Sequence, residues 1–157
     1  MKKANFLAKL FKQKTLQLVE PSLEMKDSYL MKSESSLISS KILLQNNRLE
    51  ESVGLAYYSM YHSITALLFR VGIKCENHAA AIILLRRLFN IDNSEIKLAK
   101  TERIDKQYYV SFSITLNEVE DMIKLAEKFN KMILDFISRI NSNEVLNYRI
   151  KFKSQTK

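Results

Sequence analysis

Residues 55–78 read LAYYSMYHSITALLFRVGIKCENH, and this stretch decides the fold. Its apolar and aromatic side chains recur at steps of three and four residues, as they do on the buried side of an α-helix. They form two adjoining stripes, Leu55, Tyr58, His62, Ala66 and Phe69, and then Tyr57, Tyr61, Ile64, Leu68 and Val71. A face this wide is typical of a central helix. Gly72 predicts the end of that helix, because glycine readily adopts the left-handed conformation found just after a helix C-terminus.

Another long helix is predicted before this stretch. It spans residues 22–45, because Ser22 is a good N-cap and leucines recur every seven residues behind it. The small serines on this helix would allow a neighbouring helix to approach closely. Asn47, with Glu50 three residues later, predicts a capped start for the central helix.

Two more helices are predicted after the central one. The first spans residues 77–89 and begins with an asparagine N-cap. The second spans residues 115–140, opens with a capping box made by Thr115 and Glu118, and alternates apolar steps of three and four. Residues 90–107 between them are charged and aperiodic, which predicts an irregular connection with at most one short turn.

The two ends of the chain hold its whole net charge of +8. Residues 1–20 contain five lysines and one glutamate, and residues 147–157 contain four cations and no acid, so each end carries +4. We therefore divide the chain into a basic N-terminal segment (1–20), a helical bundle (21–146) and a basic C-terminal tail (147–157). Because the bundle itself is neutral, the overall basic charge is no evidence that the bundle binds nucleic acid.

The two basic ends have different patterns. Residues 3–19 place apolar side chains between lysines at helical spacing, which predicts a short amphipathic helix. In the C-terminal tail every second residue is apolar, which predicts an extended segment that is disordered or docks on the sheet edge of a partner. The side chains that would face such a partner are Tyr148, Ile150 and Phe152.

The composition points to one all-α domain. A chain of 157 residues with two glycines and one proline does not favour sandwiches, barrels or glycine-rich phosphate loops. Lysines interrupt the N-terminal apolar residues and no apolar run reaches ~18 residues, so we expect a cytoplasmic protein without signal peptide or membrane span. The single Cys75 excludes an internal disulfide, and neither histidine has a partner at metal-ligand spacing, so no metal or cofactor is expected.

Four segments together resemble a known family. They are AYYSMYHSITALLFRVGIK (56–74), NHAAAIILL (77–85), ERIDKQYY (102–109) and TLNEVEDMIKLAEKF (115–129). Over roughly residues 25–140 the chain resembles the HEPN family, named as a nucleotide-binding domain of higher eukaryotes and prokaryotes. The resemblance implies an antiparallel bundle of four or five helices, usually a homodimer. Many members are encoded beside a small nucleotidyltransferase as toxin–antitoxin pairs, and the toxins are metal-independent ribonucleases.

The chain departs from the ribonuclease motif of this family. The toxins carry an arginine, four to six further residues and then a histidine, near the start of the last long helix. Arg103 matches the arginine, but Tyr108, Tyr109 and Val110 occupy the histidine positions, and no histidine follows. Metal-free RNA cleavage needs a group that exchanges protons near neutral pH, as histidine does with a pKa of ~6.5, whereas tyrosine has ~10. The sequence therefore resembles a branch that lacks the motif.

The candidate site residues follow from this resemblance and from their chemistry. Arg103, Tyr109 and His78 are candidates for a catalytic role. The candidates for binding nucleotide or RNA are Arg70, His78, Arg103, Tyr108 and Tyr109.

Several of these side chains have a structural alternative. His78, in a first helical turn, is either an exposed residue or a phosphate contact. His62, on the apolar stripe, is expected to be a buried, hydrogen-bonded core residue. Tyr57, Tyr58 and Tyr61 either stack on bases or pack in the core. Arg103, together with Asp105 and Tyr109, either ties a loop to the bundle or forms an altered nucleotide site.

Three functions stay open at this point. The first is a non-catalytic or weakly catalytic HEPN-type module of a toxin–antitoxin-like pair with a small nucleotidyltransferase, binding nucleotide or RNA in a dimer cleft. The second is a metal-independent ribonuclease toxin with an altered active site. The third is a purely structural helical adaptor.

Overall fold

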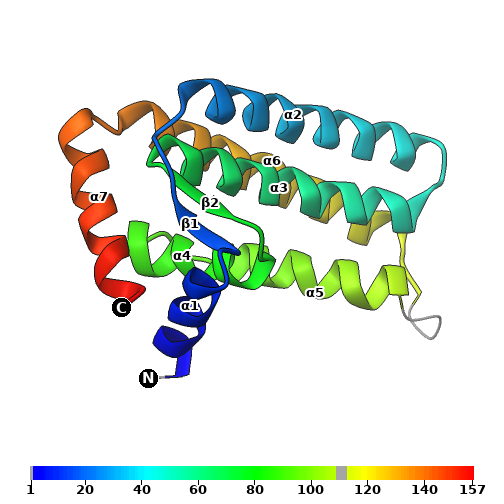
Figure 1. The fold of residues 1–157 in the computed structure, drawn as a ribbon. Helices are drawn as coiled ribbons and strands as arrows, with labels where there is room; N and C mark the ends of the chain where they lie inside the picture. The colour runs from blue at the N-terminus through cyan, green and yellow to red at the C-terminus, as the bar shows by residue number, and fades with distance from the viewer. Residues whose placement is uncertain (1, 109–112) are drawn as a thin grey trace.

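The computed structural model describes residues 2–108 and 113–157, with side chains for residues 6–106 and 113–157. The described residues form seven helices and two short strands (Figure 1), so the predicted all-α class is confirmed. In chain order the elements are α1 (Lys2–Lys12), β1 (Leu16–Leu18), α2 (Leu23–Gln45), α3 (Leu49–Arg70), β2 (Ile73–Cys75), α4 (His78–Phe89), α5 (Ser94–Tyr108), α6 (Leu116–Arg139) and α7 (Ser142–Gln155).

Helix α3 is the centre of the bundle, as predicted. Figure 1 shows α2 and α6 alongside α3, with α5 running along another side of it. Its side chains Tyr57, Met60 and Leu67 are completely buried. Serines join α2 to α3, because the Ser33 hydroxyl donates to the carbonyl of Ser59 at 2.7 Å. Small side chains therefore let the two helices approach closely, as the sequence predicted.

Three of the predicted helix starts are confirmed. Ser22, Asn77 and Thr115 each accept a hydrogen bond from a backbone N–H three residues later, at 3.0, 2.9 and 3.2 Å. The predicted cap at Asn47 is wrong. Helix α3 begins one residue later than that cap requires, its N-cap Arg48 makes no side-chain capping bond, and Asn47 adopts a positive φ of 57°.

The irregular connection predicted for residues 90–107 is also wrong, because most of it forms α5. The helix packs along α3, and Ile96 and Ala99 on that side are completely buried. Few other residues of α5 are apolar, so the sequence shows no clear periodicity. Tertiary packing of this narrow buried face, rather than an apolar pattern, stabilises the helix.

The extended tail predicted for residues 147–157 is wrong as well, because this segment continues helix α7. The helix opens with a capping box in which Asn141 and Glu144 each accept a hydrogen bond from the backbone N–H of the other. Val145 and Phe152 are both buried, one heptad apart, which is the spacing of a helical stripe. The alternation of apolar and basic residues is compatible with a strand and with a helix, and the capping box at Asn141 favours the helix.

Helix α7 docks on α1 and α4, and its Arg149 reaches the turn that follows α3. The ring of Phe152 is completely buried and meets the ring of Phe11 edge-on, with centroids 6.0 Å apart. Nη1 of Arg149 donates to the carbonyls of Val19 at 2.7 Å and Val71 at 3.0 Å. One guanidinium therefore connects the C-terminal helix to two distant parts of the chain.

A short antiparallel strand pair joins the N-terminal segment to the central helix. Leu16 of β1 lies opposite Cys75 of β2, and Leu18 lies opposite Ile73. The sequence did not predict these strands, and the helix expected over residues 3–19 ends at Lys12 instead. Gly72 does end the central helix with a left-handed φ of 78°, as predicted. None of the described helices combines the length and the apolar character needed to cross a bilayer.

Candidate functional site

Six polar and aromatic side chains gather where α3, α4 and α5 meet, and we call them the aromatic–basic cluster. Four come from the central helix, one from the first residue of α4 and one from α5. They are Tyr57, Tyr58, Tyr61, His62, His78 and Arg103. Both histidines of the chain and the arginine of the family motif therefore belong to one cluster, although they are far apart in the sequence.

His78 is held on two sides by tyrosines of α3. Its Nδ1 lies 2.7 Å from the hydroxyl of Tyr57, and its ring stacks on that of Tyr61 with centroids 3.8 Å apart. Burial, assisted by the charges of Arg103 and Lys100, lowers the pKa of His78 below its ordinary value. The imidazole is therefore neutral near pH 7 and fixed in orientation, rather than an exposed side chain at a helix start.

The hydrogen bond to Tyr57 links the tautomer of His78 to the direction in which the Tyr57 hydroxyl points. Burial raises the pKa of the Tyr57 hydroxyl far above its usual range, so this hydroxyl keeps its proton. Where the hydroxyl donates to Nδ1, the neutral ring carries its own proton on Nε2. Nε2 makes no hydrogen bond to a described residue, so in that tautomer its N–H can donate to a ligand.

Arg103, on α5, lies over the rings of Tyr57 and Tyr58. Its Nη2 donates to the hydroxyl of Tyr58 at 3.0 Å, and the guanidinium carbon lies 4.8 Å from the centre of that ring. The same carbon lies 5.5 Å from the ring centre of Tyr57, so both rings contribute cation–π attraction. Asp105 forms no ion pair with any described residue, so the predicted Arg103–Asp105 pair is not present.

His62 extends the cluster toward α2. Its ring stacks on that of Tyr58 at 6.2 Å between centroids and lies beside Tyr29 of α2 at 5.9 Å. Burial and the charge of Lys32 lower the pKa of His62. Its side chain is only half-buried, and its Nδ1 has no hydrogen-bond partner among the described residues, so the expectation of a buried, hydrogen-bonded core histidine is wrong.

The two lowered histidine pKa values make stability depend on pH. The unfolded chain binds more protons than the folded chain below pH ~6.5. The contribution of these two histidines to stability is therefore fully present above that pH and is lost on acidification.

We expect Arg103→Gln to raise the pKa of His78 and to leave that of His62 unchanged. Titration of the imidazole NMR signals measures both values in one sample. An unchanged His78 pKa would contradict the proximity of Arg103.

The other candidates lie elsewhere. Arg70 caps the end of α6, because its Nη2 donates to the carbonyl of Ile140 at 2.9 Å. Phe152 is buried inside the chain, so it cannot face a partner, whereas Ile150 is 67% exposed and Tyr148 is half-buried. Tyr109 and the side chain of Tyr108, two further candidates, lie outside the described part of the chain.

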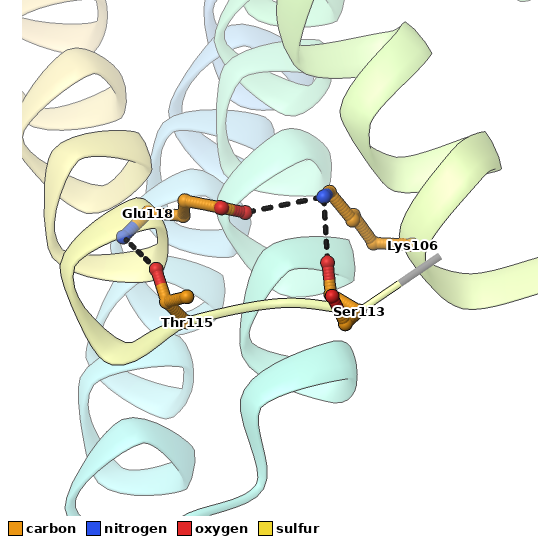
Figure 2. A network of polar contacts seen from close by, with 4 residues as sticks. All are labelled: Lys106, Ser113, Thr115 and Glu118. Atoms are coloured by element: carbon orange, nitrogen blue, oxygen red, sulfur yellow. Dashed lines mark hydrogen bonds and ion pairs between the residues drawn. The ribbon is translucent and has the colours of Figure 1, made fainter. Parts of the chain in front are cut away.

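A polar network fixes the start of α6 next to the end of α5 (Figure 2). Nζ of Lys106 donates to the carbonyl of Ser113 at 2.7 Å and lies 3.2 Å from a carboxylate oxygen of Glu118. The backbone N–H of Glu118 in turn donates to the hydroxyl of Thr115. The Glu118 carboxylate thus ties α6 to α5, the helix that carries Arg103. Among the described residues it makes no hydrogen bond to the backbone N–H of Thr115, so the Thr115 cap is present but the predicted capping box is not.

Among the described residues the cluster combines positive charge with aromatic rings but contains no set of metal ligands. Arg103 and Lys100 supply positive charge beside the His78 imidazole, and tyrosine rings supply flat surfaces. Among the described residues no three side chains of His, Cys, Asp or Glu come together in a way that would hold a metal ion. Lys100 was not identified from the sequence, although it lies three residues before Arg103 and thus on the same side of a helix.

The protein is a helical bundle whose central helix carries most of the aromatic–basic cluster. A family model described as the HEPN domain matches residues 27–137. The chain therefore belongs to the HEPN domain family, as its sequence pattern suggested.

Two curated relatives are from archaea. The chain is 30% identical over 104 residues to "Putative toxin MJ0605" of Methanocaldococcus jannaschii, a match covering 62% of this chain and 77% of the relative. It is 42% identical over 50 residues to "UPF0332 protein PH1297" of Pyrococcus horikoshii, a match covering 32% of this chain. The latter match spans only 35% of the Pyrococcus protein.

Proposed function

We propose that this protein is the HEPN component of a toxin–antitoxin-like pair, and that its aromatic–basic cluster binds the phosphate of RNA or of a nucleotide without cleaving it. The observation that carries the proposal is the convergence of His78 and Arg103 on the same tyrosines of α3. The similarity to a relative named a putative toxin supports the toxin–antitoxin part of this proposal.

The chemistry of the cluster suits a phosphate ligand. Arg103 is permanently charged, and an arginine guanidinium is a strong hydrogen-bond donor to phosphate oxygens. The Nε2–H of neutral His78 is a second donor, and Lys100 adds positive charge nearby. The Tyr58 and Tyr61 rings, both partly buried, hold these donors in place, because Arg103 lies over Tyr58 and His78 stacks on Tyr61.

The same geometry argues against the ribonuclease alternative. Cleavage without a metal needs a base that takes the proton of the attacking hydroxyl. In the proposed Nε2–H tautomer the lone pair of His78 is on Nδ1, which faces the Tyr57 hydroxyl at 2.7 Å. In this state the accessible nitrogen donates a proton and does not accept one. Burial raises the pKa of Tyr61 to about 12, so Tyr61 is also a poor base near neutral pH.

We further propose that two copies associate and that a small nucleotidyltransferase is the second protein of the pair. Both proposals rest on the family resemblance. Exposed apolar side chains on α2 and α6 leave a face that a second copy would cover, and these are Met31, Ile38, Ile42 and Leu134. Light scattering of the purified protein gives the oligomeric state directly, and a monomer at all concentrations would contradict the dimer.

Histidine NMR tests the binding proposal, because the chain has only two imidazoles. We expect His78 to show the Nε2–H tautomer and its signals to shift on addition of a 2′-O-methyl RNA, which cannot be cleaved through its 2′ position. Arg103→Ala should abolish the shift. Arg139→Ala is the matched control, because Arg139 lies exposed on α6 and pairs only locally with Asp135. If His78 does not respond to RNA or nucleotide, the proposed site is wrong.

A further inference from the structure

The fold brings the two basic ends of the chain together. Figure 1 shows α1 and α7 at the same end of the molecule. The Phe11–Phe152 ring contact joins the two helices directly. Two basic segments from opposite ends of the sequence, each with a charge of +4, therefore lie next to each other.

The described lysines of this surface form no ion pair with a described acidic side chain. Lys9, Lys12, Lys14, Lys153 and Lys157 are exposed. In the part of the chain that the structure describes, six ion pairs occur, and none of them includes a cation of α1 or α7. The bundle neutralises many of its charges internally, whereas the joined ends do not.

A hollow lies between α1 and the last residue of the chain. It has a volume of about 510 Å³ and is lined by Ala8, Lys9, Lys12, Gln13 and Lys157. Its lining therefore combines lysine ammonium groups, one amide and one methyl group, without a carboxylate side chain or a large apolar side chain.

The surface is separate from the aromatic–basic cluster and from the family domain. Its residues in α1 and at the end of α7 lie outside residues 27–137, the part of the chain that matches the HEPN model. None of the residues that line the hollow forms a hydrogen bond or ring contact with the described side chains of the aromatic–basic cluster.

We propose that α1 and the C-terminal part of α7 form a second binding surface, which holds the phosphate backbone of RNA. Here we call it the terminal basic surface, defined by Lys9, Lys12, Lys14, Lys153 and Lys157. Unpaired lysines bind phosphates through charge and release of counterions, without reading the base sequence. The surface thus increases affinity for RNA, while the cluster contacts one phosphate or nucleotide at a defined position.

Two other classes of partner fit the surface less well. A helix that lies on a membrane inserts its apolar side into lipid, but Leu7 and Leu10 of α1 are buried in the protein core. A stable protein interface has a desolvated centre rich in aromatic or aliphatic side chains. The hollow between Lys9, Lys12 and Lys157 has no such side chain. A polyanion that remains hydrated can pair with the same lysines without the free-energy cost of removing them from water.

The test compares two triple variants that lose the same charge. Lys9→Gln/Lys12→Gln/Lys157→Gln alters the terminal basic surface, and Lys41→Gln/Lys124→Gln/Lys131→Gln alters exposed lysines of α2 and α6. Fluorescence anisotropy measures binding of each full-length protein to a single-stranded 2′-O-methyl RNA of about 20 nucleotides, over a series of salt concentrations. Co-sedimentation with phosphatidylserine vesicles runs in parallel.

We expect the terminal variant to bind RNA at least about tenfold more weakly at ~0.15 M salt. The slope of the logarithm of its binding constant against the logarithm of the salt concentration should fall in magnitude by about 2, because each of three lost phosphate contacts on a single strand contributes ~0.7. The α2–α6 variant should keep most of the slope. The His78 NMR shift on saturation with RNA should survive in the terminal variant, which separates this surface from the proposed cluster site. Equal losses in both variants, unchanged RNA binding, or loss of vesicle binding alone would each overturn the proposal.

Discussion

Replacing Phe152 by alanine is expected to lower the free energy of unfolding by about 3 kcal/mol or more, the usual cost of emptying a buried aromatic site. The ring is completely buried and packs edge-on against Phe11. Without it, α7 loses its main apolar contact with α1. Urea denaturation followed by circular dichroism measures the change.

The matched control is Ile150→Ala in the same helix. Ile150 is 67% exposed, so its truncation should change the free energy of unfolding by no more than about 0.5 kcal/mol. A C-terminal tail that is extended and undocked would give small effects for both variants. That result would contradict the docking of α7 and, with it, the terminal basic surface.

Gly72→Ala is expected to destabilise the protein by about 3 kcal/mol, for two separate reasons. Its φ of 78° is strained for an L-residue by ~1–2 kcal/mol. A Cβ atom at this position would also collide with Nη1 of Arg149 and with the carbonyl of Val19, and overpacking of this kind costs ~1–3 kcal/mol. Thermal and urea unfolding both report the loss.

Asn90→Ala separates the two contributions to that loss. Asn90 has a similar φ of 56°, but it is exposed at the end of α4, so its replacement removes only the conformational preference. We expect a cost of about 1 kcal/mol there. Equal losses at Gly72 and Asn90 would mean that Arg149 does not approach the strand junction as closely as the structure places it.

The long helices could be predicted because they carry their own start signals and a wide apolar face. Ser22, Asn77 and Thr115 cap as expected, and Gly72 ends the central helix. Two of the wrong predictions concern α5 and the C-terminal end of α7, which have narrow buried faces. Their conformation depends on what they pack against, and a sequence pattern does not reveal that.

The candidate site was predictable only in part for the same reason. The family resemblance identified Arg103, and the scarcity of histidine drew attention to His78. Their approach to the same tyrosines depends on α5 being a helix that packs along α3, which the aperiodic sequence concealed. Likewise, the sequence located the positive charge in the two ends, but only the docking of α7 on α1 joins them.

The most direct test of the proposed function is a metal-free incubation of the purified protein with end-labelled RNA, beside the Arg103→Ala variant. A native gel reports binding and a denaturing gel reports cleavage in the same reactions. We expect the RNA to stay intact in both, and to be retained more strongly by the unmodified protein than by Arg103→Ala. RNA cut by the unmodified protein but not by the variant would contradict the binding role and identify a ribonuclease that works without the usual histidine.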